Sequence, residues 1–305
     1  IVDAFDEAAG SLGIDSTLFL TQNDGTLMTS TYGRRYPVAT FASGPTNSMR
    51  GAAFLSGETD CAVIDIGGTT TDIGVLRNGF PRQAPLAVEI GGVRTNFRMP
   101  DLLSLGIGGG SIVRNDQGVT VGPDSVGHRL TSKARVFGGE TLTATDIAVA
   151  AGLADIGDPR LVADLDGEFI AEALAVMRAG IAEGLDRMKI GPEPIPVVLV
   201  GGGAILLGND LPGASQLIRP NHGYVANAIG AAKSQVGGHA DRVVAMDNMT
   251  RTEAIGAVRS EAEDRCIAAG ARPETIEVVE IDEVPLAYLP SNAVRITARA
   301  VGDLG

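Results

Sequence analysis

Apolar and polar residues alternate along the first third of the chain in a pattern that predicts helices and short strands. Residues 1–12 have the spacing of an amphipathic helix, and the apolar run at 16–21 is typical of a strand. Residues 43–55 open with Ser, Gly and Pro and predict a second helix, because proline is tolerated in a first helical turn. Strands with short joins follow, which predicts sequential antiparallel pairing of 61–68, 70–79 and 85–95.

The middle of the chain is rich in glycine. We expect a helix at 98–105, then a glycine loop and a hairpin within 106–123 that turns at Gln117 and Gly118. Residues 124–142 have no regular pattern, and Thr143 or Thr145 is the expected cap of a helix that ends near residue 154.

Longer elements are predicted in the second half. Residues 167–189 form an amphipathic helix by their spacing, and the β-branched run at 196–200 predicts a buried central strand. A helix is expected at 225–236, and Thr250 with Glu253 has the spacing of a capping box at the start of another. The remaining strands of the tail are predicted at 242–246, 275–281 and 293–300.

Composition narrows the possible functions. The chain has 305 residues, 44% of them apolar, so a packed core is expected and wholesale disorder is excluded. Its net charge is −13, so nucleic acid is not an expected partner, and no apolar run reaches the roughly 18 residues of a membrane helix. Cys61 and Cys266 are far apart and the histidines are scattered, which predicts a cytoplasmic protein without a zinc site.

One segment combines glycines with carboxylates. A buried strand delivers Asp65, then Gly67 and Gly68 turn the chain, Thr69 and Thr70 add hydroxyls, and Asp72 begins the returning strand. Backbone N–H groups in such a turn can close on a phosphate, with the carboxylates acting through Mg²⁺. The alternative is a plain hairpin in which Asp65 only caps the turn. We favour the phosphate interpretation because the strand, the carboxylate, the two glycines, the hydroxyls and the second carboxylate follow one another in this order.

A second glycine turn follows the central strand. Gly201, Gly202 and Gly203 would let a flat nucleoside approach the backbone, and the small residues at 226–232 come after them. Taken in order, these segments resemble the phosphate and adenosine segments of the actin-like ATPase superfamily. The resemblance implies an α/β fold: a ribonuclease H-like lobe with a mixed five-stranded sheet flanked by helices, plus a small αββ appendage at the C-terminus.

Within that superfamily the chain is most similar to the hydantoinase/oxoprolinase A-subunit family. The segments that carry this resemblance are 43–55, 65–76, 105–113, 119–127 and 143–146. The sequence departs from the family at 128–140, where a loop rich in Pro, Gly and Cys is usual. The resemblance implies ATP-dependent activation of a cyclic amide or carbonyl substrate, as in hydantoinases and 5-oxoprolinases, together with a B-type partner subunit.

The resemblance also assigns expected roles to residues. Catalytic or water-orienting carboxylates would be Asp65, Asp101 and Asp146, although the last two suit the first turn of a helix equally well. Mg²⁺ would bind at Asp65 and Asp72. The residues expected to contact ATP are Gly67, Gly68, Thr69, Thr70, Asp72, Gly108, Gly109, Gly110, Ser111, Gly201, Gly202 and Gly203. Of these, residues 108–111 are expected to form an oxyanion-facing or phosphate-facing loop.

The expected domains are the closing elements of a first lobe at 1–57, a second lobe at 58–237 with an insertion near 106–143, and an αββ subdomain at 238–305. Only one phosphate hairpin is present, so the opening sheet of the first lobe is expected upstream, and this piece alone is expected to bind ATP weakly and turn over nothing. Two other functions stay open: a non-enzymatic ATPase switch of the reactivase or chaperone type, and a degenerate lobe that serves as a scaffold.

Overall fold

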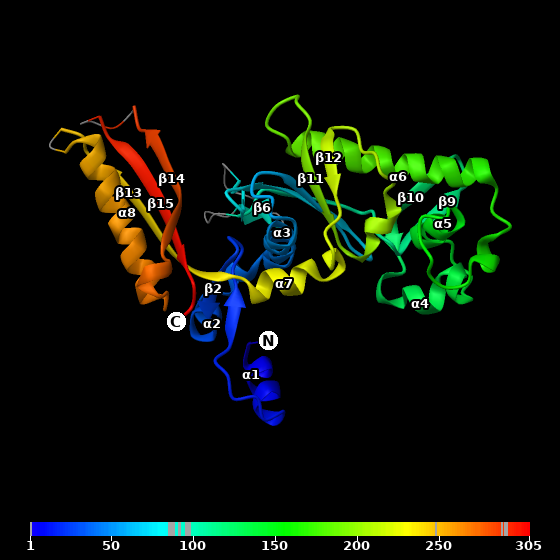
Figure 1. The fold of residues 1–305 in the computed structure, drawn as a ribbon, viewed down its shortest axis with the longest axis horizontal. Helices are drawn as coiled ribbons and strands as arrows, with labels where there is room; N and C mark the ends of the chain where they lie inside the picture. The colour runs from blue at the N-terminus through cyan, green and yellow to red at the C-terminus, as the bar shows by residue number, and fades with distance from the viewer. Residues whose placement is uncertain are drawn as a thin grey trace. The chain divides into compact units, whose positions relative to one another are not determined.

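The computed structural model describes residues 2–84, 89–90, 93–94, 99–247, 249–287, 289 and 292–305. Two compact units make up the chain (Figure 1). The larger unit spans Gly44–Lys233, and the smaller unit combines Ile1–Ser43 with Ser234–Gly305. No helix among the described residues has the length and apolar character needed to cross a membrane.

A mixed sheet forms the centre of the larger unit. Its strands are β3 (Ala62–Ile66), β4 (Thr71–Arg77), β5 (Phe80–Pro81), β8 (Leu102–Leu105), β11 (Ile195–Val200) and β12 (Ala214–Ile218). They are ordered β12-β11-β3-β4-β5, and β8 also pairs with β4. β11 runs parallel to β12 and to β3, whereas β4 is antiparallel to β3, β5 and β8. This confirms the predicted mixed α/β sheet, but the sheet has six strands, one more than the five expected, because β8 also pairs with β4.

Helices cover both faces of this sheet, which explains why its central strands are almost entirely apolar. On one face, α5 (Ala144–Ala150) and α6 (Gly167–Met188) pack against the side chains of β3 and β4. On the other, α3 (Ser43–Ser56) and α7 (Ala226–Ala232) pack against β3, β4 and β11 (Figure 1). Glycines let α3 and α7 approach closely, because a Cβ at Gly51 would collide with the Ala226 carbonyl and one at Gly230 with that of Asn47.

The predicted insertion is a hairpin followed by short helical turns. β9 (Ser111–Asn115) and β10 (Val119–Ser125) pair antiparallel around residues 116–118, as the glycine signal predicted. The segments after them are η2 (Gly127–Arg129), α4 (Leu130–Lys133), η3 (Arg135–Phe137) and η4 (Pro159–Val162). Thr143, not Thr145, caps α5.

A second sheet belongs to the smaller unit, ordered β1-β2-β13-β15-β14. These strands are β1 (Phe19–Thr21), β2 (Thr26–Thr29), β13 (Gln235–Val244), β14 (Glu277–Pro285) and β15 (Val294–Gly302). α8 (Arg251–Ala268) packs on β13 and β15, and its start carries the predicted capping box of Thr250 and Glu253. Short helices complete the unit: α1 (Val2–Ser11), α2 (Ser30–Arg35), η1 (Pro37–Thr40) and η7 (Pro273–Thr275).

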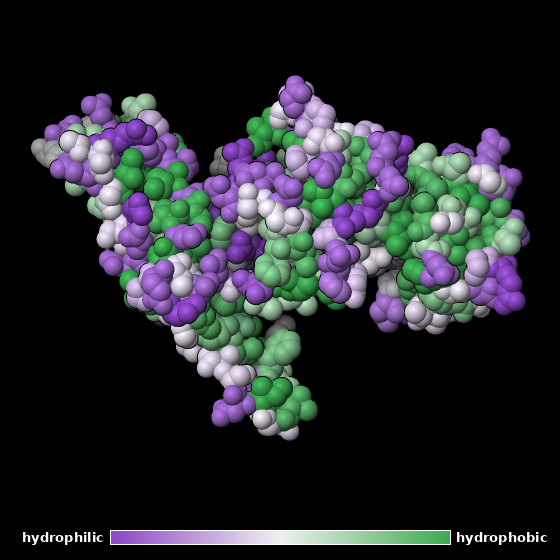
Figure 2. All heavy atoms as spheres, viewed as in Figure 1, coloured by the Kyte–Doolittle hydropathy of each residue, from purple (hydrophilic) through white to green (hydrophobic). Residues whose placement is uncertain are grey.

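The N-terminal helix contributes little to the core of the smaller unit. None of the residues of α1 is buried, and Phe5 is 58% exposed. Figure 2 shows apolar atoms over the surface of this helix. Packing within the described residues therefore leaves the apolar side of α1 open to solvent.

Two predicted helices are wrong in part. Residues 102–105 form β8, because Leu103 and Leu105 alternate toward α6 while the backbone pairs with β4. The helix predicted at 225–236 ends at Ala232, and β13 begins at Gln235. A Cβ at Gly238 would collide with the Ala262 carbonyl, so a glycine at this position lets α8 lie close to the strand.

The predicted third strand at 85–95 also differs. Most of it lies outside the described residues, and within it β6 (Glu89–Ile90) and β7 (Val93–Arg94) pair with each other instead of joining the central sheet. The predicted division of the chain differs as well, because β1 and β2 from the N-terminal part share a sheet with the tail. The tail has the helix and the three strands predicted along the sequence, so the αββ description of the subdomain left out its first strand, β13.

Candidate functional site

Two carboxylates face each other at one end of the central sheet. Asp65 on β3 lies directly opposite Asp72 on β4, and Asp72 lies opposite Ser104 on β8. Residues directly opposite in antiparallel strands point to the same face with their Cβ atoms about 4.5–5.5 Å apart. The Ser104 hydroxyl donates a hydrogen bond to Asp72 Oδ1. The sheet thus places the two predicted metal-binding carboxylates side by side.

Both carboxyl groups resist ionisation. Burial raises the pKa of Asp65, a hydrogen bond from Ser48 on α3 lowers it, and the charge of Asp72 raises it again, for a net rise. Burial likewise raises the pKa of Asp72, with the Ser104 hydrogen bond opposing it. A cation between these groups would relieve the repulsion, because an opposite charge within a few ångströms favours the ionised form.

The donor set suits magnesium with phosphate. Among the described residues no three His, Cys, Asp or Glu side chains converge in a way that could hold a metal by themselves. Mg²⁺ commonly binds through one or two carboxylates, with water and substrate phosphate oxygens completing the octahedron. Asp65 and Asp72 therefore fit the part of such a shell that a protein supplies.

The turn after β3 offers backbone donors beside these carboxylates. The Gly67 N–H donates to the Thr70 carbonyl at 2.8 Å and closes the turn. The N–H groups of the next three residues, 68–70, find no acceptor within the described chain, and all three residues are exposed. A Cβ at Gly68 would meet nothing within 4 Å, so the space in front of the turn is open. Successive free N–H groups of this kind bind anions.

The second glycine turn packs against the first. Gly201 has a φ of +85°, and a Cβ there would collide with Asp65 Oδ1 and the Ile66 carbonyl, so only glycine fits. A Cβ at Gly203 would lie 2.8 Å from the Gly67 oxygen, whereas one at Gly202 would meet nothing within 4 Å. The first and third glycines hold the turn against β3, and the middle one faces open space, at the start of η5 (Gly202–Leu206).

The third glycine loop braces the first turn. Gly109 and Gly110 donate their N–H groups to the carbonyls of Gly67 and Gly68, at 2.9 and 2.7 Å. The Gly108 N–H donates to Ser111 Oγ at 2.8 Å, and the Ser111 N–H returns to the Gly108 carbonyl at 3.0 Å. All four N–H groups are thus engaged within the protein. Residues 108–111 therefore use these N–H groups to hold the loops in place, and their expected position facing an oxyanion or phosphate stays a prediction.

Asp146 holds the loop structure together. It is fully buried, and its carboxylate accepts hydrogen bonds from the Val136 N–H at 2.7 Å, the Thr143 N–H at 2.7 Å and the Thr143 hydroxyl at 2.8 Å. The structure therefore favours the capping role that the sequence left open, and not the catalytic one.

Asp101 lies away from the turns. It pairs with Arg82 at 2.6 Å, and Arg82 also donates to the Met188 carbonyl at 2.9 Å. In β8 it is Leu105 that pairs next to the turn, so Asp101 precedes the opposite end of that strand. The ion pair supports a structural role for Asp101, and its catalytic assignment stays a prediction.

Sequence reasoning missed the hydroxyls that support the site. Ser48 and Ser104 hydrogen-bond the two carboxylates, Thr71 Oγ1 donates to the Ile107 carbonyl at 2.6 Å, and Thr145 Oγ1 donates to the Gly109 carbonyl at 2.9 Å. A serine between leucines in residues 102–105 is the signal for Ser104, but only if that segment is taken as a strand. The partner of Ser48 lies on another element and leaves no local signal.

Comparisons with known proteins identify the family and the fold of this chain. Residues 2–158, half of the chain, match the hydantoinase/oxoprolinase family. The chain is 31% identical over 119 residues to the acetophenone carboxylase gamma subunit of Aromatoleum aromaticum, and 31% identical over 125 residues to the acetone carboxylase beta subunit of Xanthobacter autotrophicus. Each match covers 37% of this chain and 16% of the relative.

Solved structures extend the likeness of fold to nearly the whole chain. An ATP-dependent caprolactamase from Pseudomonas jessenii has a TM-score of 0.71 at 16% identity, covering 100% of this chain and 56% of the caprolactamase chain. A nucleotide-free acetone carboxylase has a TM-score of 0.65 at 15% identity, covering 99% of this chain and 55% of the carboxylase chain. The chain thus spans a small part of its curated relatives and about half of these structures. On the strength of the matching segment and this fold, the chain belongs to the hydantoinase/oxoprolinase family.

Proposed function

We propose that this chain forms an ATP-binding lobe of an enzyme that activates the carbonyl group of a cyclic amide or ketone. The family supports this class of reaction, and so do the structures with a similar fold, which are named as an acetone carboxylase and an ATP-dependent caprolactamase. The observation that carries the proposal is local: free N–H groups at residues 68–70 lie next to Asp65 and Asp72 in one open turn.

The chemistry follows from what an unactivated carbonyl lacks. An amide nitrogen is a poor leaving group and a ketone carbon is a weak electrophile. Transfer of the γ-phosphoryl group of ATP to an amide oxygen forms one P–O bond, breaks the P–O bond to the departing ADP and makes the carbonyl carbon attackable by water. The same transfer to a ketone oxygen, with loss of an α-proton, gives an enol phosphate. The enzyme therefore needs to hold ATP in line with the carbonyl oxygen and to neutralise charge on the phosphates.

The residues of this chain divide that work. The N–H groups of Gly68, Thr69 and Thr70 would hold phosphate oxygens, and the turn around Gly202 would let the nucleoside lie against the backbone. Asp65 and Asp72 would hold Mg²⁺, which supplies positive charge to the phosphates when it is bound. Ser48 and Ser104 orient the two carboxylates through their hydrogen bonds.

The proposed function also includes a partner subunit. The curated relatives are named as the gamma and beta subunits of carboxylases. We infer that this chain also works with a second subunit, which completes the reaction on the activated substrate.

The test is an ATP hydrolysis assay of the full-length enzyme with its partner subunit, against hydantoins, oxoproline, caprolactam and ketones. We expect one class to stimulate ADP release with stoichiometric substrate conversion. Asp65→Asn should lower kcat by about 10²-fold or more, because preorganised charge at a phosphoryl group is lost. Asp116→Asn, which removes the same charge from the exposed hairpin turn, is the control.

Two outcomes would overturn the proposal. Unchanged turnover in Asp65→Asn would mean that this turn does not bind the reacting nucleotide. ADP release driven by a protein client, with no small-molecule conversion across the panel, would instead indicate a non-enzymatic ATPase switch.

A further inference from the structure

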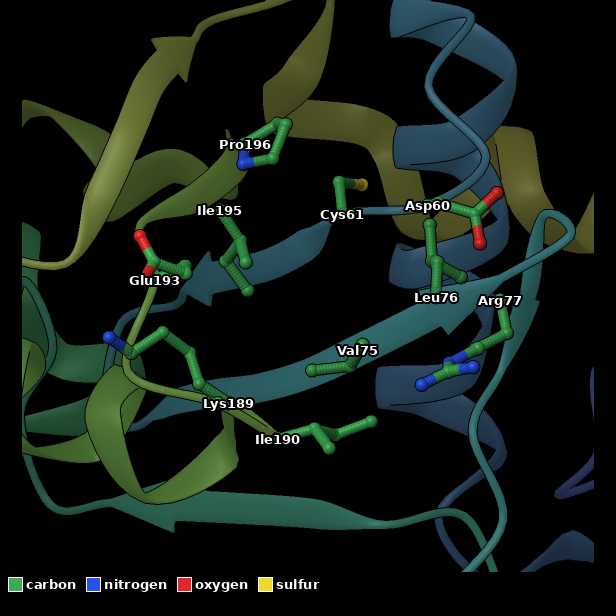
Figure 3. Close-up of a pocket in the computed structure, with 11 residues that line it drawn as sticks. Asp60, Cys61, Val75, Leu76, Arg77, Lys189, Ile190, Glu193, Ile195 and Pro196 are labelled. Atoms are coloured by element: carbon green, nitrogen blue, oxygen red, sulfur yellow. The ribbon is translucent and has the colours of Figure 1, made fainter.

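A cavity of about 270 Å³ lies in the larger unit, at the end of the central sheet opposite the glycine turns (Figure 3). It is bordered by the start of β3 at Cys61, the end of β4 at Val75–Arg77, and the start of β11 at Ile195. Cys61 precedes Asp65 by four residues of extended chain, which places the cavity about 13 Å from the carboxylate pair. The cavity is thus separate from the proposed nucleotide site.

The floor of the cavity is apolar and uncharged. Leu76 and Cys61 are buried, and Val75 is 8% exposed. Burial raises the pKa of the Cys61 thiol to about 12, with the charges of Glu58 and Asp60 adding to the rise, so the thiol stays protonated. Ile190 stands at the mouth with 68% of its surface exposed, an unusual position for a large aliphatic side chain.

One cation at the rim is free to bind a ligand. Arg77 is exposed, and its side chain forms no ion pair or hydrogen bond with any described residue. Figure 3 shows its guanidinium group turned toward Val75 and Ile190, while the carboxylate of Asp60 points away from them.

The other cation is already committed. Lys189 Nζ lies 3.1 Å from Asp186 and 3.3 Å from the Pro192 carbonyl, and its side chain is only 4% exposed. Arg77 is therefore the available positive charge beside an apolar floor, and the carboxylates of Asp60 and Glu193 also line the cavity.

We propose that this cavity binds a small organic carboxylate with an apolar body. The planar guanidinium group of Arg77 can hold a carboxylate through two parallel hydrogen bonds. The apolar body would cover Val75 and Ile195 and contact Ile190. The volume is just below the roughly 300–1,000 Å³ of pockets that hold drug-sized ligands, so a smaller metabolite fits.

The ligand class has a chemical connection to the proposed function, on which this step rests. Opening a cyclic amide with water breaks the C–N bond and leaves a carboxylate and an amine. Carboxylation of a ketone also leaves a carboxylate. A pocket for such molecules, joined to the glycine turns by β3, β4 and β11, would let product lower the activity of the lobe that helped to make it.

Binding is tested on this chain without any assay of activity. The probe is hexanoate, titrated by calorimetry and by amide chemical shifts, with hexanol as the uncharged analogue and acetate as the analogue without an apolar body. We expect hexanoate to bind and to shift the amides of Cys61, Val75 and Ile190, and both analogues to bind at least about tenfold more weakly, because each lacks one of the two contacts.

Two exposed positions provide variants that should fold normally. Arg77→Gln and Ile190→Ser should each weaken hexanoate binding by about tenfold or more. Arg129→Gln is the matched control, since Arg129 is an exposed arginine of the same unit outside the cavity. Absence of hexanoate binding, or equal binding to Arg77→Gln and Arg129→Gln, would overturn the proposed site.

The regulatory step is tested on the full-length enzyme with its partner. Hexanoate should lower kcat for ATP hydrolysis without raising the KM for ATP, and Arg77→Gln should remove this inhibition while keeping basal turnover. Inhibition that survives Arg77→Gln, or binding without inhibition, overturns the regulatory role. If no ATP hydrolysis depends on Asp65, the proposed function fails, and the binding titration still decides the site.

Discussion

Two carboxylates make the folded chain sensitive to pH at the scale of single residues. Burial raises the pKa of both Asp65 and Asp72. The folded chain therefore binds more protons than the unfolded chain between the unfolded and folded pKa values. The stability that these groups contribute is complete below the unfolded pKa of about 3.9 and is lost as the pH rises through the folded pKa.

Asp72→Asn should therefore melt at a higher temperature than the parent chain at about neutral pH, and at the same temperature below about pH 3, where both carboxyls are protonated. The amide removes the charge and keeps an oxygen for the Ser104 hydroxyl. Thermal unfolding across pH measures the difference, with Asp116→Asn as the control. A lower melting temperature for Asp72→Asn at neutral pH would contradict the charge pair.

Asp146 is expected to behave in the opposite way. Its removal leaves the N–H groups of Val136 and Thr143 buried without an acceptor. Each such group costs about 1–3 kcal/mol, so Asp146→Ala should lower the free energy of unfolding by at least that amount. Chemical denaturation measures this loss, and kcat per folded molecule should stay near the parent value. An Asp146→Ala variant that is stable but inactive would instead support a catalytic role for Asp146.

At the scale of elements, Gly108 and Gly68 lie in neighbouring loops and have different structural roles. A Cβ at Gly108 would lie 2.6 Å from the Thr69 nitrogen, whereas one at Gly68 would meet nothing within 4 Å. Gly108→Ala should therefore destabilise the larger unit by about 1–3 kcal/mol, as overpacking usually does. Gly68→Ala should fold normally and lose ATP affinity, because its methyl group enters the space in front of the free N–H groups.

Denaturation and ATP binding, measured on both variants, separate the two roles. Normal stability in Gly108→Ala would mean that the third loop does not brace the turn. Unchanged ATP affinity in Gly68→Ala would place the phosphates elsewhere.

The same loops show which parts of the site could be predicted from the sequence. Glycine spacing and an apolar strand predicted the turns at 67–68 and 201–203 and their order, since both signals are local. The bracing by Gly109 and Gly110 could not be predicted, because it depends on backbone groups of residues about 40 positions earlier. The strand at 102–105 was mistaken for a helix because four residues are too few to separate the two periods.

At the scale of the whole molecule, the smaller unit is assembled from both ends of the chain. β2 and β13 pair through only two register positions, Thr26 with Gln235 and Leu27 with Val236. No local pattern reports a contact between segments more than 200 residues apart, which is why the sequence placed them in separate domains. The core of α8 with β13 and β15 is in turn distinct from the cores around β3.

Separate cores predict that the two units unfold separately and that only one of them responds to nucleotide. The glycine turns and both carboxylates belong to Gly44–Lys233. A ligand at 100 times its Kd stabilises the state that binds it by about 2.7 kcal/mol. Saturating Mg²⁺ and ATP should therefore raise the midpoint temperature of one calorimetric transition and leave that of the other unchanged. Hydrogen exchange identifies which unit unfolds in each transition. The amides of β3 and β11 should exchange in the transition whose midpoint rises, and those of β13 and β15 in the transition whose midpoint is unchanged. Gly68→Ala should show both transitions without the shift. A single transition, or a shift shared by both, would mean that the units are coupled, and nucleotide binding would then have to be assigned to the chain as a whole.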